Sequence, residues 1–310
     1  MIIEALKAFL IGVVEGFTEW LPISSTGHMI LVDEFVKLNV DPDFLELFLV
    51  VIQIGAILAV IILYFHKLNP FSGTKTSAER KSTWRLWGMV VIGCIPAAIV
   101  GLLLDDWVHE HFYNATVVAA MLILYGIIFI ALERRNRHRF TQYVHDRCIG
   151  GEELPLLEDG SPDPDQLFAI KTVDEIDWKA ALKIGLFQCL AIIPGTSRSG
   201  ATIIGGMLTG CSRTASAEFT FFLAIPIMFG WGMVKTIKYS MAIAGGASVF
   251  GALELTVLVV GVVTAFVVSV ISIMFLMGYI KKNDFTAFGV YRIIVGAIVL
   301  LYFGAKVFLL

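Results

Sequence analysis

The chain has 310 residues, of which 57% are hydrophobic and 16% are charged, and its formal net charge at pH 7 is −3. Soluble domains have about 25% charged residues and roughly 45–50% apolar ones. Together with a mean hydropathy of +0.83, this composition excludes an ordinary soluble enzyme and indicates a membrane protein with several spanning segments. Nothing in it indicates nucleic-acid binding, and the four cysteines do not form a disulfide framework.

Six apolar stretches are long enough to cross the hydrocarbon core of a bilayer, which is roughly 30 Å thick and needs about 20 apolar residues. We predict spanning helices near residues 44–66, 86–104, 115–133, 216–236, 254–280 and 286–308. Two shorter helix pairs are broken by proline, at 2–21 and 24–38 around Pro22 and at 179–193 and 197–210 around Pro194. Broken helices occur in membranes where irregular backbone lines a cavity, so both pairs are predicted to be re-entrant.

The spacing of these elements repeats along the chain. Pro22 precedes Glu46 by 24 residues, and Pro194 precedes Glu218 by the same 24. Each Glu opens a long apolar span, where a negative charge suits the helix dipole, and we expect both to be structural. Each half contains one re-entrant pair and three spans, and an odd number of crossings inverts the second half. The predicted fold class is an all-α polytopic membrane protein with an inverted-topology repeat.

We predict a single integral membrane domain over residues 1–310, with repeat 1 at about 1–133, a polar insert at about 134–177 and repeat 2 at about 178–310. Basic residues are concentrated after the first, third and fifth spans, whereas the loop predicted at 105–114 is acidic. Cytoplasmic loops carry the excess of Lys and Arg. The insert is therefore predicted to be a cytoplasmic loop, and both chain termini are predicted to be extracytoplasmic.

The first break carries two carboxylates and two candidate nucleophiles. Glu15 and Glu19 lie four residues apart and share one helix face. A carboxylate inside a membrane segment is costly and indicates function, here metal binding or proton transfer. Ser25 and His28 are three residues apart and share a face of the next helix. A serine becomes nucleophilic when a neighbouring base takes its proton; the alternative for Ser25 is helix capping alone.

The second break carries an arginine among hydroxyl groups. Arg198 near mid-membrane needs an anionic partner, and its planar fork fits phosphate oxygens; the alternative is a structural pair with Glu15 or Glu19. The helix N-termini after both breaks offer free N–H groups that bind anions, so we predict a phosphate site with room for a metal. Its further candidates are Ser24, Thr26, Gly27, Thr196, Ser197, Ser199 and Thr202. Gln53, inside an apolar span, is a weaker candidate for the same cavity.

Both motifs strongly resemble those of the bacterial undecaprenyl-diphosphate phosphatase family, also called the bacitracin-resistance family. The resemblance is carried by residues 15–28, EGFTEWLPISSTGH, and residues 194–202, PGTSRSGAT. The apolar layout resembles the family over nearly the whole chain, although the 134–177 insert is longer than usual for it. The resemblance implies hydrolysis of undecaprenyl diphosphate to undecaprenyl phosphate and inorganic phosphate. This reaction recycles the lipid carrier for peptidoglycan synthesis and confers bacitracin resistance.

The resemblance also implies roles for single residues. Glu15 and Glu19 match the family's acidic motif, and a divalent cation, Mg²⁺ or Ca²⁺, is the implied cofactor at this pair. Ser25 and His28 match its catalytic pair, and Arg198 matches its phosphate-binding arginine. The implied partners are the polyprenyl diphosphate and membrane lipid. The implied location is the bacterial plasma membrane, with the active site open to the extracytoplasmic side, and a homodimer is left open.

The alternative hypothesis is an inverted-repeat transporter or lipid flippase for a phosphorylated substrate, because broken helices at an anion site also suit a transporter. A carrier needs charge compensation but no nucleophile, so Ser25 and His28 beside two carboxylates favour the phosphatase. A purely structural scaffold leaves Arg198 and the carboxylates unexplained.

Overall fold

The fold was analysed in a computed structural model that describes residues 1–151, 153–156, 160–245 and 250–309. This part of the chain is helical, and its only β pairing consists of two isolated bridges. The α-helices are α1 (Ile2–Thr18), α2 (Ser25–Phe35), α3 (Pro42–Leu63), α4 (Phe65–Leu68), α5 (Ser77–Phe112), α6 (Ala115–Gly150), α7 (Trp178–Gln188), α8 (Arg198–Thr209), α9 (Arg213–Ala244), α10 (Ala252–Ile280) and α11 (Thr286–Leu309). Three short 3-10 helices are η1 (Pro164–Leu167), η2 (Val173–Glu175) and η3 (Cys189–Ile192).

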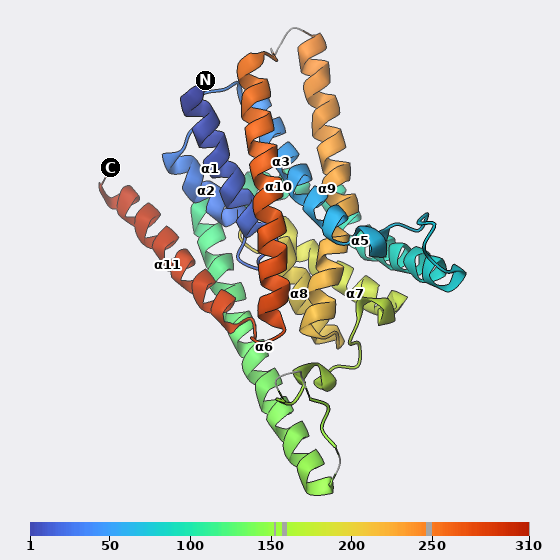
Figure 1. The fold of residues 1–310 in the computed structure, drawn as a ribbon. Helices are drawn as coiled ribbons and strands as arrows, with labels where there is room; N and C mark the ends of the chain where they lie inside the picture. The colour runs from blue at the N-terminus through green and yellow to red at the C-terminus, as the bar shows by residue number, and fades with distance from the viewer. Residues whose placement is uncertain (152, 157–159, 246–249, 310) are drawn as a thin grey trace.

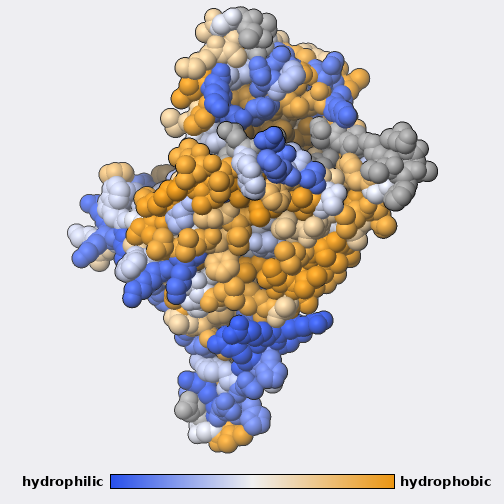
Figure 2. Space-filling model, turned by 180° about the vertical axis from the view of Figure 1, so that it is seen from behind, coloured by the Kyte–Doolittle hydropathy of each residue, from blue (hydrophilic) through white to orange (hydrophobic). Residues whose placement is uncertain are grey.

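The six predicted spans are confirmed. Within the described residues, α3, α5, α6, α9, α10 and α11 are each long and apolar enough to cross a membrane. Figure 2 shows hydrophobic residues covering the middle of the molecule and hydrophilic residues covering its lower end, which Figure 1 assigns to α6 and the insert. Long apolar helices with large exposed apolar side chains, such as Leu102 and Ile271, need lipid around them, so the chain is an integral membrane protein.

Two predicted loops are wrong in part, because the neighbouring helices continue into them. Helix α5 extends to Phe112, into the loop predicted at 105–114, and α6 extends to Gly150, into the insert predicted at 134–177. Neither extension contains Pro or Gly before its end, and Arg, Glu and Gln are good helix formers. Helix α6 stops only at Gly151, whose φ of 68° suits a helix C-terminus.

The two proline-centred breaks are confirmed, and both have the same local geometry. Ser24 has φ 75° and accepts a hydrogen bond from the N–H of Gly27, while Ser197 has φ 73° and accepts one from Gly200. Among the described residues, these two serines are the only non-glycine residues with positive φ. Each serine therefore caps the helix that follows its break, and the two motifs are local structural repeats.

The helices pack in matching pairs across the two halves (Figure 1). Helix α1 packs on α10 and α7 packs on α5, while α3 packs on α9 and α6 on α11. Helices α3 and α9 are antiparallel, because Glu46 at the start of α3 pairs with Lys235 near the end of α9, and Glu218 at the start of α9 pairs with Lys67 beyond α3. Antiparallel packing of equivalent helices is what an inverted repeat requires, and the inverted repeat as a whole stays a prediction.

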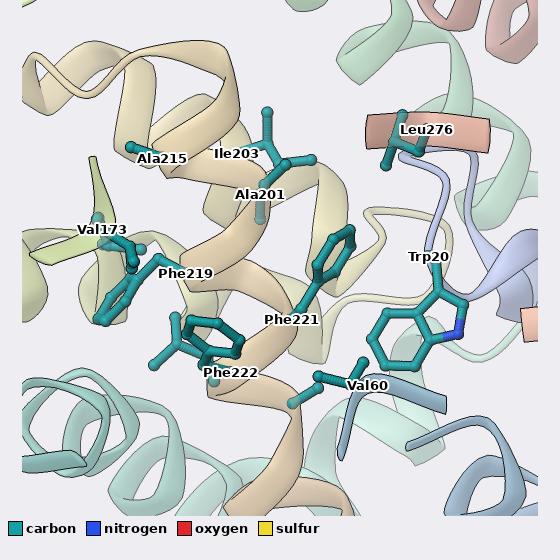
Figure 3. Close-up of a cluster of buried hydrophobic side chains, with 14 of the residues drawn as sticks. Trp20, Val60, Val173, Ala201, Ile203, Ala215, Phe219, Phe221, Phe222 and Leu276 are labelled. Atoms are coloured by element: carbon teal, nitrogen blue, oxygen red, sulfur yellow. The ribbon is translucent and has the colours of Figure 1, made fainter. Parts of the chain in front are cut away.

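The core lies directly behind the first break. Trp20 is fully buried and meets the ring of Phe221 edge-on, with 5.4 Å between ring centroids. Figure 3 shows Trp20 facing Phe221 and Val60, with Phe222 and Phe219 further along α9. These large side chains fix the irregular segment after α1 against α9 and α3, which positions the preceding residue, Glu19.

A buried polar cluster lies where α6 leaves its predicted span and approaches the insert. Glu133 is fully buried and accepts hydrogen bonds from Arg213 at 2.9 and 2.6 Å and from the backbone N–H of Phe285 at 3.1 Å. It thus ties α6 to the starts of α9 and α11. Nearby on the insert, burial raises the pKa of Asp165 to about 6.

We predict that Glu133→Gln destabilises the protein by about 3–5 kcal/mol, because it leaves the Arg213 charge buried without an anion. The measurement is thermal unfolding in detergent. The control is Arg137→Gln, which removes a surface ion pair with Asp284 and should cost about 0–1 kcal/mol. Equal unfolding temperatures for Glu133→Gln and the wild type would show that the buried pair is not a major source of stability.

Candidate active site

The two breaks face one polar cavity, here called the polar pocket. It has a volume of about 200 Å³ and lies between the breaks and the helices α3 and α9. Its polar lining consists of Glu19, Gln53, Ser25, Ser197, Arg198 and Ser199, and its apolar lining includes Ile227, Met228 and Trp231. The pocket therefore collects side chains from both motifs.

Glu19 is the centre of the polar pocket. Its Oε2 accepts a hydrogen bond from the hydroxyl of Ser25 at 2.8 Å, and its Oε1 accepts one from Nη2 of Arg198 at 2.8 Å. Arg198 also donates from Nη1 to the carbonyl oxygen of Thr220 at 3.0 Å. Glu19 thus contacts Arg198 with one carboxylate oxygen and the Ser25 hydroxyl with the other, in the position of a base for the Ser25 proton.

Arg198 retains donor capacity in this arrangement. Its Nε is buried and has no hydrogen-bond partner within the described structure, and a guanidinium has five N–H donors in all. The pair with Glu19, predicted as the alternative to phosphate binding, is therefore present, but it leaves some of the Arg198 donors unused. An anion in the polar pocket could use them.

Glu15 lies one helical turn before Glu19 and is only 1% exposed. It does not line the polar pocket, but the charged groups of Glu19 and Arg198 are near enough to interact with it electrostatically. Its Oε1 has no hydrogen-bond partner in the described part of the chain. A buried carboxylate with a free oxygen needs a cation or a proton.

The donor set fits a hard divalent cation. The described residues contain no group of three or more His, Cys, Asp or Glu side chains that could hold a metal. Mg²⁺, however, is commonly bound by one or two carboxylates, with water and substrate phosphate completing its shell. Glu15 and Glu19 are suited to that mode, and the cation itself stays a prediction.

His28 is held away from Ser25. Its Nδ1 lies 2.7 Å from the carbonyl oxygen of Ser24, and its Nε2 lies 2.7 Å from the hydroxyl of Tyr291, on which the ring is stacked. Since a carbonyl oxygen only accepts, Nδ1 carries the proton, and Nε2 of a neutral ring accepts from Tyr291. Glu19, rather than His28, is thus the base in contact with Ser25.

The predicted phosphate-binding hydroxyls divide into two groups. Ser197 and Ser199 line the polar pocket, where Ser199 also donates to the carbonyl oxygens of Glu19 and Leu21. Ser24, Gly27, Thr196 and Thr202 do not line it, and the Thr26 side chain lies outside the described residues. Ser24 and Gly27 hydrogen-bond each other, Thr202 is bonded to Arg198 and Thr220, and Thr196 is fully buried.

Sequence reasoning missed the contribution of α11. Tyr291 contacts His28, and the adjacent Arg292 is fully buried against both breaks. A signal was available, because an arginine inside a predicted span is as costly as Glu15. Trp231 of the pocket rim carried no such signal, since a tryptophan in a span is ordinary.

The fold and the polar pocket define a polytopic helical membrane protein with a site built from two broken helices. Residues 8–298 match the family model described as "Bacitracin resistance protein BacA". The chain belongs to this family.

Relatives from several bacteria are similar to the chain over nearly its full length. The chain is 51% identical over 296 residues to "Undecaprenyl-diphosphatase" of Enterococcus faecalis, with 96% of each chain covered. It is 50% identical over 306 residues to the protein of the same name in Desulfitobacterium hafniense, with 98% of each covered. It is 49% identical over 302 residues to "Undecaprenyl-diphosphatase 1" of Clostridioides difficile, with 97% of each covered. The likeness thus covers both motifs and nearly the full length.

We predict that Arg198→Lys lowers kcat for phosphate release by about 10²–10³, because lysine lacks the fork that donates to phosphate oxygens. KM should change less, since the contact tightens in the transition state. The purified variant is assayed for kcat and for thermal unfolding. A stability loss with kcat within about threefold of wild type would instead assign Arg198 only to its pair with Glu19.

Proposed function

We propose that this chain is an undecaprenyl-diphosphate phosphatase, which hydrolyses the lipid diphosphate to undecaprenyl phosphate and inorganic phosphate. The observation that carries the proposal is the contact of the Ser25 hydroxyl with Glu19, itself paired to Arg198. The names of the full-length relatives support the same reaction and substrate. The family's description supports a role in bacitracin resistance.

In the first step, Oγ of Ser25 attacks the terminal phosphorus, and the Ser25 proton passes to Glu19. The bond from phosphorus to the bridging oxygen breaks, and undecaprenyl phosphate leaves. Arg198 donates to the oxygens of the transferring group, on which negative charge is concentrated. In the second step, water attacks the phosphorus of the phosphoserine and the bond from phosphorus to Oγ breaks. Inorganic phosphate leaves with the water oxygen, and Oγ takes back the proton held by Glu19, which restores the Ser25 hydroxyl.

A divalent cation at Glu15 and Glu19 would neutralise phosphate charge when bound. The free Oε1 of Glu15 supports this assignment. Glu15 otherwise has no described ion-pair partner, whereas Glu19 is shared between Ser25 and Arg198.

An apolar groove offers room for the prenyl tail. It has a volume of about 340 Å³ and is lined mainly by Ile11, Met29, Val32, Val36, Leu45, Leu49 and Phe303. Met29 follows Ser25 of the polar pocket by four residues on α2, and Leu49 precedes Gln53 of that pocket by four on α3. Residues four apart lie on one helix face, so groove and pocket follow the same faces of both helices.

The hydrogen bond from Ser25 to Glu19 also favours the phosphatase over the transporter. A carrier for a phosphorylated lipid needs Arg198 but has no use for a serine held on a carboxylate. The discriminating condition is detergent solution, where no gradient exists and only an enzyme turns over.

The test is phosphate release from undecaprenyl diphosphate by purified protein in detergent. We expect turnover by the wild type, its loss on chelation of divalent cations, and a decrease of at least about 10³ for Ser25→Ala. The matched control is Ser272→Ala, a buried serine of α10 that bonds only its own helix. Turnover by Ser25→Ala close to that of Ser272→Ala would exclude Ser25 as the nucleophile.

We further propose that the protein lies in the bacterial plasma membrane with its insert in the cytoplasm and the polar pocket open to the opposite side. The Lys and Arg residues after the first, third and fifth spans support this orientation. The basic end of α6 and the insert also form the hydrophilic lower end in Figure 2.

Cys148, exposed near the end of α6, tests the orientation without a new cysteine. We expect an impermeant thiol reagent to label it only after the cells are permeabilised. Cys148→Ser provides the background control, and Asn39→Cys in that background should be labelled in intact cells. Labelling of Cys148 from outside intact cells would reverse the proposed topology.

A further inference from the structure

Arg292 of α11 is a fully buried arginine that pairs with no carboxylate in the part of the chain that the structure describes. Its side chain is 0% exposed, and no carboxylate of the described residues forms an ion pair with it. Its guanidinium lies over the ring of Tyr125, 5.5 Å from the ring centroid. An uncompensated buried charge is costly, so its other contacts must explain why it is there.

Those contacts are backbone carbonyl oxygens of both breaks. Arg292 donates from Nη1 to Pro22 at 3.1 Å, and from Nη2 to Gly195 and Thr196 at 2.8 Å each. A longer contact of 3.5 Å joins Nε to the carbonyl oxygen of Leu122 on α6. One planar group thus binds the turn before the nucleophile and the turn before the phosphate-binding arginine.

The two turns orient the groups that react. Pro22 lies three residues before Ser25 and Thr196 lies two residues before Arg198. Serine caps with positive φ follow both turns, and such backbone persists only where its surroundings determine it. Arg292 also lies close to the first turn of α8, where a Cβ added to Gly200 would be 3.1 Å from its Nη1.

We propose that Arg292 is a positioning residue for the phosphatase reaction: it joins the two turns so that Ser25 and Arg198 keep the separation that phosphoryl transfer requires. The inference rests on the proposed function. Arg292 does not line the polar pocket, so it acts through the backbone and not on the substrate. Lysine cannot replace it, because a point donor cannot span carbonyl groups from two turns.

The test compares Arg292→Lys, which keeps the charge, with Arg292→Met, which removes it at similar length. We expect kcat to fall by about 10- to 100-fold in Arg292→Lys, since small displacements of reacting groups cost rates of this order. KM should stay within about threefold, because the pocket lining is intact. The kcat of Arg292→Met should fall by at least as much as that of Arg292→Lys.

The matched control is Arg213→Lys, also a buried arginine, whose partner Glu133 lies outside the polar pocket. It should lose thermal stability and keep its kcat. If Arg292→Lys behaves in the same way, Arg292 is only structural and the proposal is wrong. Failure of both Arg292 variants to fold would also overturn it, because stability would then explain the residue.

A double-mutant cycle tests whether Arg292 acts through Arg198. The two Lys substitutions together should lower kcat by clearly less than the product of their separate effects, since both disturb one arrangement. Multiplying effects would contradict the proposal. If Ser25→Ala and Arg198→Lys lower turnover as expected while Arg292→Lys keeps it, this inference fails alone; if the wild type itself releases no phosphate, the proposed function fails.

Discussion

One ion pair joins the two halves of the chain at the active site. Arg198 and Glu19 are 179 residues apart in sequence and lie 2.8 Å apart in the structure. Neither charge could stay in a membrane interior by itself, so the pair stabilises each half only when the other has folded against it. The hydrogen bond to Ser25 uses the second oxygen of the same carboxylate. The carboxylate that pairs with the arginine of the other half is therefore also the one that contacts the nucleophile we propose.

Much of the fold followed from local sequence properties. Hydropathy located the six spans. Pro22 and Pro194 located the breaks together with the hydroxyl clusters and glycines that follow them, because a proline disfavours helical backbone at the residue before it; Pro96 and Pro226, without such clusters, lie inside α5 and α9. The C-terminal ends of α5 and α6 were predicted too early, because hydropathy was used to place them. Hydropathy detects where lipid ends, but a helix of good formers continues into water until a residue such as Gly151 stops it.

The site was predictable as a set of residues and not as a set of contacts. Two carboxylates, two nucleophiles and an arginine indicated the chemistry, and Glu19, Ser25 and Arg198 do meet in one pocket. The spacing of Ser25 and His28 also suggested a hydrogen-bonded pair. In the structure His28 instead pairs with Tyr291 of α11, which lies 263 residues later in the sequence. No local pattern encodes such a contact, since it depends on how α11 packs against α6 and the first break.

The ion pairs at the two ends of the α3–α9 contact have a consequence for motion. Lys235 with Glu46 holds one end, and Lys67 with Glu218 holds the other, at 2.6 and 3.0 Å. Rocking one helix against the other about their midpoint would stretch one of these pairs in either direction. Alternating-access carriers depend on such rocking between their halves, whereas an enzyme gains from a rigid wall beside its reacting groups. Gln53 and Met228 line the polar pocket from these same two helices, so the shape of the cavity is coupled to a contact that carries an ion pair at each end.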